Sequence, residues 1–156
     1  MKEYIYYYKS PIGNLRLVAD DNSILALDFP EERESNEEEY PQVIMDCVAQ
    51  LEEYFSGKRK SFDISYLLKG TEFQKKVWYE LTEIPYGETV SYKYIAEKLG
   101  NEKAVRAVGT TNGKNPISII IPCHRVVGAN GKLTGYAWGL WRKQWLLQHE
   151  KNYKNK

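Results

Sequence analysis

Strand-like patterns occupy the first thirty residues. Residues 4–8 are rich in tyrosine, residues 15–18 alternate with a period of two, and residues 24–29 form a third apolar run. Turn sequences separate these runs, Pro-Ile-Gly-Asn at 11–14 and Asp-Asp-Asn at 20–22. We therefore expect three antiparallel strands connected as a meander.

A highly charged stretch, EERESNEEEY at 31–40, follows the strands and is expected to be an exposed loop. From Pro41 to near Gly57, apolar side chains recur at steps of three and four residues, which predicts a helix with Cys47 packed beside its apolar stripe. Residues 61–68 are expected to add a last strand.

The second half of the chain is predicted to be mostly helical. A capping box, Thr71 with Gln74, precedes an apolar series that is broken by Pro-Tyr-Gly at 85–87. A final helix is expected from Trp138 to about Lys151. Each of these helices has apolar residues at helical spacing.

Two short amphipathic helices in this half are predicted to meet at a Gly-Asn corner. Ser91 caps the first, Gly100 ends it, and Asn101 caps the second. This is a helix-turn-helix pattern, although many helical hairpins with the same pattern bind no nucleic acid.

An apolar segment follows the helix pair. Asn112-Gly113 and Asn115-Pro116 are turn sequences, and the apolar run 117–121 is bounded by prolines. We expect this run to be a short buried strand.

Together these elements predict an α+β fold. An N-terminal antiparallel sheet plus helix is followed by a mostly helical part with a winged-helix-like helix-turn-helix. We expect two domains, an N-terminal α/β domain at residues 1–70 and a C-terminal domain at residues 71–156.

The charge of the chain divides at the same place. The formal net charge is +1, but residues 1–70 carry 8 basic and 14 acidic side chains, whereas residues 71–156 carry 14 basic and 7 acidic ones. Such asymmetry favours an anionic partner for the basic half, although two ordinary solvated surfaces explain it equally well.

Several classes of protein are excluded by composition. The N-terminus MKEYIYYYKS lacks the apolar core of a signal peptide, and the longest strongly apolar run is far too short to span a bilayer. Two cysteines and two histidines form neither a disulfide scaffold nor a set of zinc ligands, so no metal is expected. We expect a cytoplasmic protein.

The candidate chemistry lies in IPCHRVV, residues 121–127. Cys123 is followed at once by His124, a plausible base for a thiol nucleophile. Such a histidine needs a carboxylate to orient it, and either His149 or its neighbour Glu150 in the final helix could fold back onto this segment. Adjacency alone also fits a buried structural cysteine beside a core histidine.

These residues carry a resemblance to a known family. IPCHRVV, with SYKYIAEKLGNEKAVRAVGTTNGKNP before it and GYAWGLWRKQWLLQHE after it, resembles the O6-alkylguanine-DNA alkyltransferases, also called methylated-DNA–protein-cysteine methyltransferases. The match covers roughly residues 71–150. The N-terminal part fits the family's variable first domain only in outline.

The resemblance implies a direct, single-turnover repair reaction without a cofactor. Cys123 would accept the alkyl group from O6-alkylguanine, with O4-alkylthymine as a lesser substrate. His124 would act as a base through a bridging water, Glu150 would orient it, and Asn115 would brace the turn before the active-site segment.

It also implies how the protein meets its partner, double-stranded DNA that contains alkylated bases. Tyr92 would crowd the target phosphate and offer its hydroxyl to the guanine, and Arg106 would enter the base stack from the minor groove. Tyr136 would line the pocket and Lys143 would help to stabilise it. Substrate and DNA contacts are thereby implied for Tyr92, Arg106, Val126, Tyr136, Ala137, Trp138 and Lys143. We expect the protein to act as a monomer.

The residues themselves are compatible with these roles. A base inside the duplex hides the atom under attack, so its nucleotide must be extruded, and a planar arginine cation suits the gap that it leaves. Salt-sensitive contacts to phosphates are expected from Lys98, Lys103, Lys114 and Lys132. The acidic half should face away from the duplex.

Two positions depart from the human-type pattern of this family. Ala137 stands where some members have a serine, which leaves backbone groups to contact the substrate oxygen. Trp138 stands where some have glycine, and we expect its ring to restrict large alkyl groups.

Two rival functions remain at this point. A non-catalytic lesion sensor would resemble this architecture, but relatives of that type have tryptophan at the cysteine position. A transcription factor built on the helix pair would show strong sequence preference, whereas we expect contacts that are independent of sequence apart from the lesion.

Overall fold

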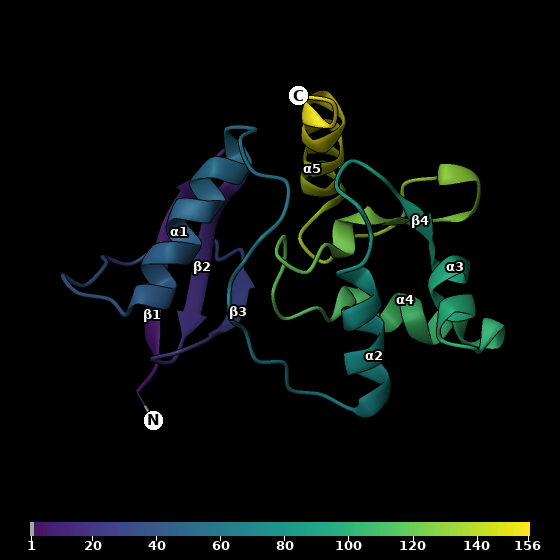
Figure 1. Ribbon diagram of the computed structural model, residues 1–156, viewed down its shortest axis with the longest axis horizontal. Helices are drawn as coiled ribbons and strands as arrows, with labels where there is room; N and C mark the ends of the chain where they lie inside the picture. The colour runs from purple at the N-terminus through teal and green to yellow at the C-terminus, as the bar shows by residue number, and fades with distance from the viewer. Residues whose placement is uncertain (1) are drawn as a thin grey trace. The chain divides into compact units, whose positions relative to one another are not determined.

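The computed structural model describes residues 2–156, which form two compact units (Figure 1). The first contains the described residues up to Leu68 together with Pro116–Ser118, and the second contains Lys69–Asn115 and Ile119–Lys156. Residues 116–118 therefore belong to the N-terminal unit, although the residues on both sides of them in the sequence belong to the second unit.

The N-terminal unit contains the predicted meander. Strands β1 (Tyr4–Ser10), β2 (Gly13–Ala19) and β3 (Ile24–Asp28) form an antiparallel sheet in the order β1-β2-β3. Gly13 has a φ of 106°, a conformation that side chains other than glycine rarely adopt, and this allows the tight turn between the first two strands.

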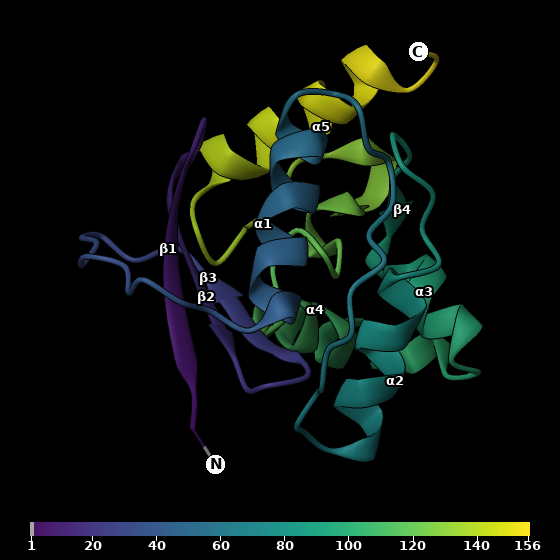
Figure 2. The same ribbon diagram turned by 60° about the vertical axis from the view of Figure 1, so that its left-hand side comes forward.

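Helix α1 packs on this sheet, as Figure 2 shows. Helix α1 (Gln42–Phe55) begins after Pro41 and contacts β1 and β2. Its buried stripe includes Cys47, which is fully buried as predicted. The charged residues 31–39 form the expected exposed loop.

Residues 61–68 do not form the expected strand. They make one isolated bridge, in which Tyr66 pairs with Ile24, supported by hydrogen bonds from Ile24 N to Ser65 O and from Leu67 N to Ile24 O. The side chains of this segment alternate between exposed and half-buried, as in a strand, but the segment forms no longer series of hydrogen bonds to a neighbouring strand.

The second unit begins with α2 (Glu72–Leu81). Its capping box is present in full: the Thr71 hydroxyl accepts from Gln74 N, and the Gln74 amide oxygen accepts from Thr71 N. The helix ends earlier than the apolar series, because the chain continues to Ile84 in turns with tighter hydrogen bonds.

The predicted helix-turn-helix is confirmed. Helix α3 (Tyr92–Lys98) is capped by Ser91, and Gly100 with a φ of 79° ends it. Asn101 caps a 3₁₀ turn, η1 (Glu102–Ala104), that continues into α4 (Val105–Gly113). Asn112-Gly113 is therefore the last turn of a helix rather than a loop, contrary to the prediction.

The expected strand at 117–121 is also wrong. Ile117 makes one bridge with Leu27, and residues 118–120 form a turn in which Ile119 adopts a positive φ of 72°. A run of buried isoleucines bounded by prolines has the composition of a strand. These side chains can nevertheless be buried in a turn, without the hydrogen bonds that pair one strand with another.

The chain then reaches the remaining elements. A 3₁₀ turn, η2 (Cys123–Arg125), leads into β5 (Val126–Val127), which pairs in parallel with β4 (Val90–Ser91). After η3 (Ala129–Gly131), helix α5 (Leu140–Tyr153) closes the chain.

Helix α5 begins two residues later than Trp138, because Gly139 has a φ of 97°, which is not helical. The α+β fold class, with an antiparallel sheet and helix followed by a mostly helical part, is confirmed. Among residues 2–156, no helix is both long enough and apolar enough to cross a bilayer.

Candidate active site

Cys123 opens the turn η2, directly after Pro122, and only 4% of its surface is exposed. Burial raises the pKa of its thiol. Hydrogen bonding from Asn115, the charge of Lys143 and hydrogen bonding from Tyr136 each lower that pKa without reversing the shift. The resting residue is therefore a neutral thiol that needs a base to become a nucleophile.

His124 follows in the same turn and is fully buried. Its Nε2 lies 2.7 Å from Oε2 of Glu150 in α5. Burial lowers the pKa of His124, against the effect of this carboxylate. The other ring nitrogen, Nδ1, is buried and has no hydrogen-bond partner among residues 2–156, so it is the nitrogen that can accept a proton.

Glu150, rather than His149, is the partner that folds back onto the active-site turn. The ring of His149 stacks instead on Trp145, with centroids 4.8 Å apart, and lies 5.0 Å from Tyr153. Burial by itself would raise the pKa of Glu150, but His124 and Arg125 hold it well below its usual range. Glu150 is therefore a carboxylate at neutral pH.

Sequence reasoning missed Arg125. Its Nε donates to Glu150 Oε1 at 2.8 Å and its Nη2 donates to Oε2 at 3.1 Å, which makes the pair bidentate. Its Nη1 donates to the carbonyl of Ile84 at 2.7 Å. No local signal marks this role, because the carboxylate lies 25 positions away in the sequence.

Two buried amides hold the turn that carries Cys123. Asn115 Nδ2 donates to Ile121 O at 2.7 Å, and Asn112 Nδ2 donates to Cys123 O at 3.2 Å. Asn115 was expected to brace this segment, whereas Asn112 was expected only to mark a turn. No sequence signal marks Asn112 for this role, because only the structure shows that its amide meets the buried carbonyl of Cys123.

A second group of side chains surrounds the loop between β5 and α5. The Tyr92 and Thr134 hydroxyls are 2.9 Å apart, and Lys143 Nζ donates to Thr134 O at 3.3 Å. Lys143 is fully buried, and burial lowers its pKa although Cys123 opposes the shift. The side chain of Thr134 packs close to Gly128, where a Cβ would come within 2.8 Å of its methyl group. Thr134 was not singled out from the sequence.

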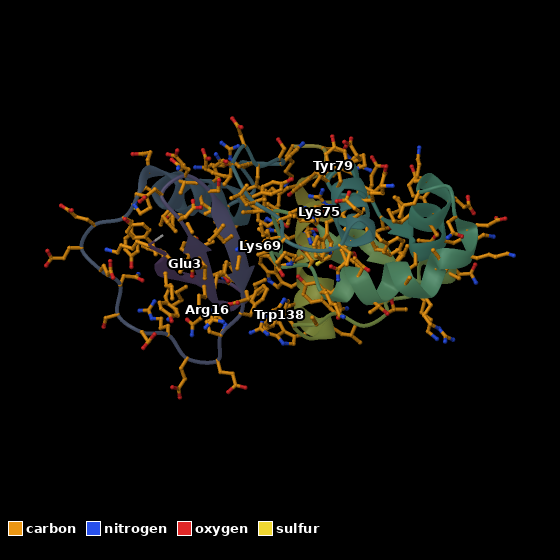
Figure 3. The ribbon with its side chains drawn as sticks, turned by 90° about the horizontal axis from the view of Figure 1, so that it is seen from below. Glu3, Arg16, Lys69, Lys75, Tyr79 and Trp138 are labelled. Atoms are coloured by element: carbon orange, nitrogen blue, oxygen red, sulfur yellow. The ribbon has the colours of Figure 1, made fainter. Side chains whose placement is uncertain are left out.

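The remaining candidates differ in exposure. Val126 is fully buried in β5, Tyr136 and Trp138 are half-buried, and Ala137 is exposed. Trp138 lies in the segment before α5 (Figure 3), and its carbonyl accepts from Arg142 Nη1 at 2.9 Å.

Arg106 projects from α4 into solvent, away from the buried Val108. With Lys103 and Thr110 of the same region, and Thr71 and Gln74 at the start of α2, it lines an open groove. Lys98, Lys103, Lys114 and Lys132 are all exposed. This surface can therefore present cations to a polyanion.

No group of three or more His, Cys, Asp or Glu side chains within residues 2–156 is arranged to hold a metal ion. The chemistry that these residues can perform is proton transfer and nucleophilic attack by a thiol. Cys47, the other free cysteine, is buried, and burial raises the pKa of its thiol to about 12.

Comparison with known proteins places both units in one family. Residues 72–152 match the profile described as "6-O-methylguanine DNA methyltransferase, DNA binding domain", and residues 4–67 match its "ribonuclease-like domain". A methylated-DNA–protein-cysteine methyltransferase of Methanosarcina acetivorans is 49% identical, over 94% of this chain and 97% of the relative. One of Mycolicibacterium paratuberculosis is 48% identical, over 92% of this chain and 90% of the relative.

Solved structures agree with the sequence relatives. A crystal structure of the Mycobacterium tuberculosis O6-methylguanine methyltransferase is 43% identical, has a TM-score of 0.88 and covers 97% of this chain and 94% of its own. A crystal structure of the Mycobacterium tuberculosis OGT in complex with DNA is 44% identical, also has a TM-score of 0.88, and covers 96% of this chain and 94% of its own. The chain belongs to the 6-O-methylguanine DNA methyltransferase family.

Proposed function

We propose that this protein repairs DNA by moving an alkyl group from O6 of an alkylated guanine to the sulfur of Cys123, once per molecule. The observation that carries the proposal is the buried series Cys123–His124–Glu150, in which a carboxylate lies 2.7 Å from Nε2 of the histidine that follows the buried cysteine in the same turn. The names of the relatives and the DNA complex of one of them support this function.

The chemical step follows from the state of each group. The neutral thiol of Cys123 gives its proton through a bridging water to His124, whose Nδ1 is available, and the imidazolium is stabilised by Glu150. The thiolate attacks the alkyl carbon, the carbon–O6 bond breaks, and its electron pair returns to the guanine. The guanine takes up a proton, and His124 releases the one that it accepted, so the histidine is neutral again. The product is a thioether at Cys123 and an unmodified guanine.

A thioether is not readily returned to a thiol, so each molecule acts once. The reaction also requires a free thiol before it begins, and both cysteines are free in the structure. We therefore place the protein in the reducing cytoplasm. We also propose that it acts as a monomer, because one chain supplies Cys123, His124 and Glu150 together. O4-alkylthymine presents an equivalent alkyl–oxygen bond and is the lesser substrate.

Access to the buried thiol requires the nucleotide to leave the duplex. Extrusion costs a few kcal/mol and is least costly for a base that pairs poorly, which favours alkylated guanine. Tyr92, at the start of α3, would turn the target phosphate, and the exposed Arg106 of α4 would fill the gap from the minor groove. Tyr136, Ala137, Trp138 and Lys143 would form the pocket, with Val126 packed behind it.

Intact mass tests the transfer directly. Incubation with a duplex that contains one O6-methylguanine should add one methyl group to the wild-type protein, located on the Cys123 peptide. The Cys123→Ala protein should bind the same duplex and leave it unrepaired. An unchanged mass in the wild type would falsify the transfer and favour a lesion sensor instead.

A second experiment tests the role of Arg106. We expect Arg106→Ala to slow repair of a methylated duplex much more than repair of the free base O6-methylguanine, because only the duplex leaves a gap to be filled. Lys58→Ala, which removes an exposed lysine of the N-terminal unit, is the control and should lack this selectivity. Equal slowing on both substrates would contradict the role.

A further inference from the structure

The carboxylate of Glu150 accepts several hydrogen bonds, to both of its oxygens. It accepts hydrogen bonds from His124 Nε2, from Nε and Nη2 of Arg125, and from Gly87 N at 3.2 Å. Its side chain is fully buried, and that of Arg125 is 8% exposed. The Glu150–Arg125 pair is thus a buried, bidentate and electrically neutral unit next to His124.

Neutrality of this unit matters for a base. A buried carboxylate whose only neighbour is an imidazole attracts a proton onto that imidazole, because the ion pair satisfies the charge. A histidine that is already protonated cannot accept the thiol proton of Cys123. The site therefore needs a carboxylate that orients His124 without protonating it in the resting state.

The charged and titratable groups that act on His124 come from two elements. Glu150 and Lys143 belong to α5, whereas Arg125 belongs to η2. Burial is the largest influence that lowers the pKa of His124; among the charged groups, Glu150 favours the imidazolium, and Arg125 and Lys143 oppose it. Of these two cations, only Arg125 is bonded to the same carboxylate as His124.

We propose that Arg125 is a positioning residue that supplies the counter-charge of Glu150 and so keeps His124 neutral and ready to accept the thiol proton. This rests on the proposed function, in which His124 is the base. Contacts to Ile84 O and to the ring of Tyr86, 5.6 Å from the guanidinium carbon, hold Arg125 in place. After proton transfer, the same carboxylate stabilises the imidazolium, and no other bond changes in this unit.

The experiment compares Arg125→Gln, which can still donate a hydrogen bond but carries no charge, with Arg125→Lys, which keeps the charge. Methyl transfer from a methylated duplex to Cys123 is followed by intact mass between pH 5.5 and 9. In Arg125→Gln the acidic limb of the rate profile should move up by about one pH unit, which makes transfer about tenfold slower on that limb and restores it at high pH. The limb of Arg125→Lys should stay near that of the wild type.

A purely structural role gives a different result. If Arg125 had only a structural role, Arg125→Gln would slow transfer by the same factor at every pH, and this outcome overturns the proposal. The proposal is also overturned if the acidic limb of the rate profile lies at the same pH in Arg125→Gln and in the wild type. A limb that moves equally in the Lys and Gln variants overturns it too.

Ring ¹⁵N NMR keeps the proposal testable if Arg125→Gln does not fold. In the wild type and in Arg125→Lys, the His124 ring must be neutral at pH 7, and a charged ring overturns the proposal. Assignment comes from His149→Gln, which leaves His124 as the only histidine. If the wild type gains no methyl group, the proposed function fails, while a His124 ring pKa that is higher in Arg125→Gln than in the wild type still supports the electrostatic role of Arg125.

Discussion

Nε2 of His124 and Oε2 of Glu150 lie 2.7 Å apart although 26 positions separate them in the sequence. The pair joins the active-site turn to the final helix, and both side chains are fully buried. Its protonation is therefore coupled to folding, because the unfolded chain exposes both groups to water.

The stability of the protein should fall as the pH drops from 7.5 to 5.5. The pKa of His124 is lowered below its ordinary value of 6.5, chiefly by burial, so in this range the unfolded chain binds a proton that the folded protein does not. The free energy of unfolding then falls by up to about 1.4 kcal/mol for each pH unit. Urea unfolding at pH 7.5, 6.5 and 5.5 measures this.

His124→Gln is the control, and its stability should change less over the same interval. Glu150 should cause a second decrease in the free energy of unfolding at lower pH. Its pKa is held below the ordinary 4.5 by His124 and Arg125, despite burial, so its contribution is present above that value and declines as the pH falls further. A wild-type stability that rises between pH 7.5 and 5.5 would contradict the assignment.

Asn115 and Asn112 offer a matched pair of substitutions. Both amides donate to buried carbonyls, of Ile121 and Cys123 respectively, so replacing either by alanine should cost about 1–3 kcal/mol of stability. Only Asn115 also lowers the pKa of the Cys123 thiol, against the larger effect of burial. Asn115→Ala should therefore slow alkylation of Cys123 by iodoacetamide at pH 8, whereas Asn112→Ala should not.

Peptide mass spectrometry of the Cys123 peptide measures that reaction, and circular dichroism shows that each variant is folded. Faster alkylation in Asn115→Ala than in Asn112→Ala would mean that Asn115 shields the thiol rather than stabilising the thiolate.

Trp138 should limit the size of the alkyl group. Its ring is half-buried just before α5, in a segment whose direction is set by Gly139 at a φ of 97°. Removing the ring should speed inactivation by O6-benzylguanine by about tenfold or more, the scale at which a pocket discriminates between apolar groups, and change methyl transfer little.

Trp138→Gly tests this, and Trp138→Ala controls for the added backbone freedom of glycine. Residual thiol activity after timed incubation with the benzylated base gives the rate. Equal benzyl rates in the wild type and both variants would show that another group sets the limit.

Much of the fold could be predicted because its signals are local. The Thr71 capping box, the Ser91 cap and the Gly100 terminus each act within one helical turn, and all three are present. The run 117–121 was predicted wrongly because its apolar residues are buried in a turn, and burial alone does not distinguish a turn from a strand.

The site was predictable to a lesser degree. Cys123 and His124 are adjacent in the sequence, and the family resemblance supplied Glu150 and Asn115. Arg125 and Thr134 were missed because their partners, Glu150 and Tyr92, lie 25 and 42 positions away. Pairings at that distance depend on tertiary packing and leave no periodic signal.

Lys103 and Lys114 provide the last prediction, which concerns DNA binding without repair. Both side chains are exposed at either end of the segment that contains α4, on the same helix-turn-helix as Arg106. If each contacts a phosphate, the Lys103→Gln/Lys114→Gln protein should bind an unmodified duplex more weakly at low salt. The slope of log affinity against log salt should then be smaller in magnitude by about 1.8, since each lost contact removes about 0.9.

The exposed residues Glu37, Glu38 and Glu39 supply the control, because their negative charge is repelled by the phosphates of DNA. Replacing all three by glutamine should leave both the affinity and the salt slope close to those of the wild type. Fluorescence anisotropy of a labelled duplex, titrated at several salt concentrations, measures both quantities. The assignment of the DNA-binding surface would be wrong if the glutamate and lysine variants changed binding by equal amounts, because the effect would then follow net charge rather than contact with phosphate.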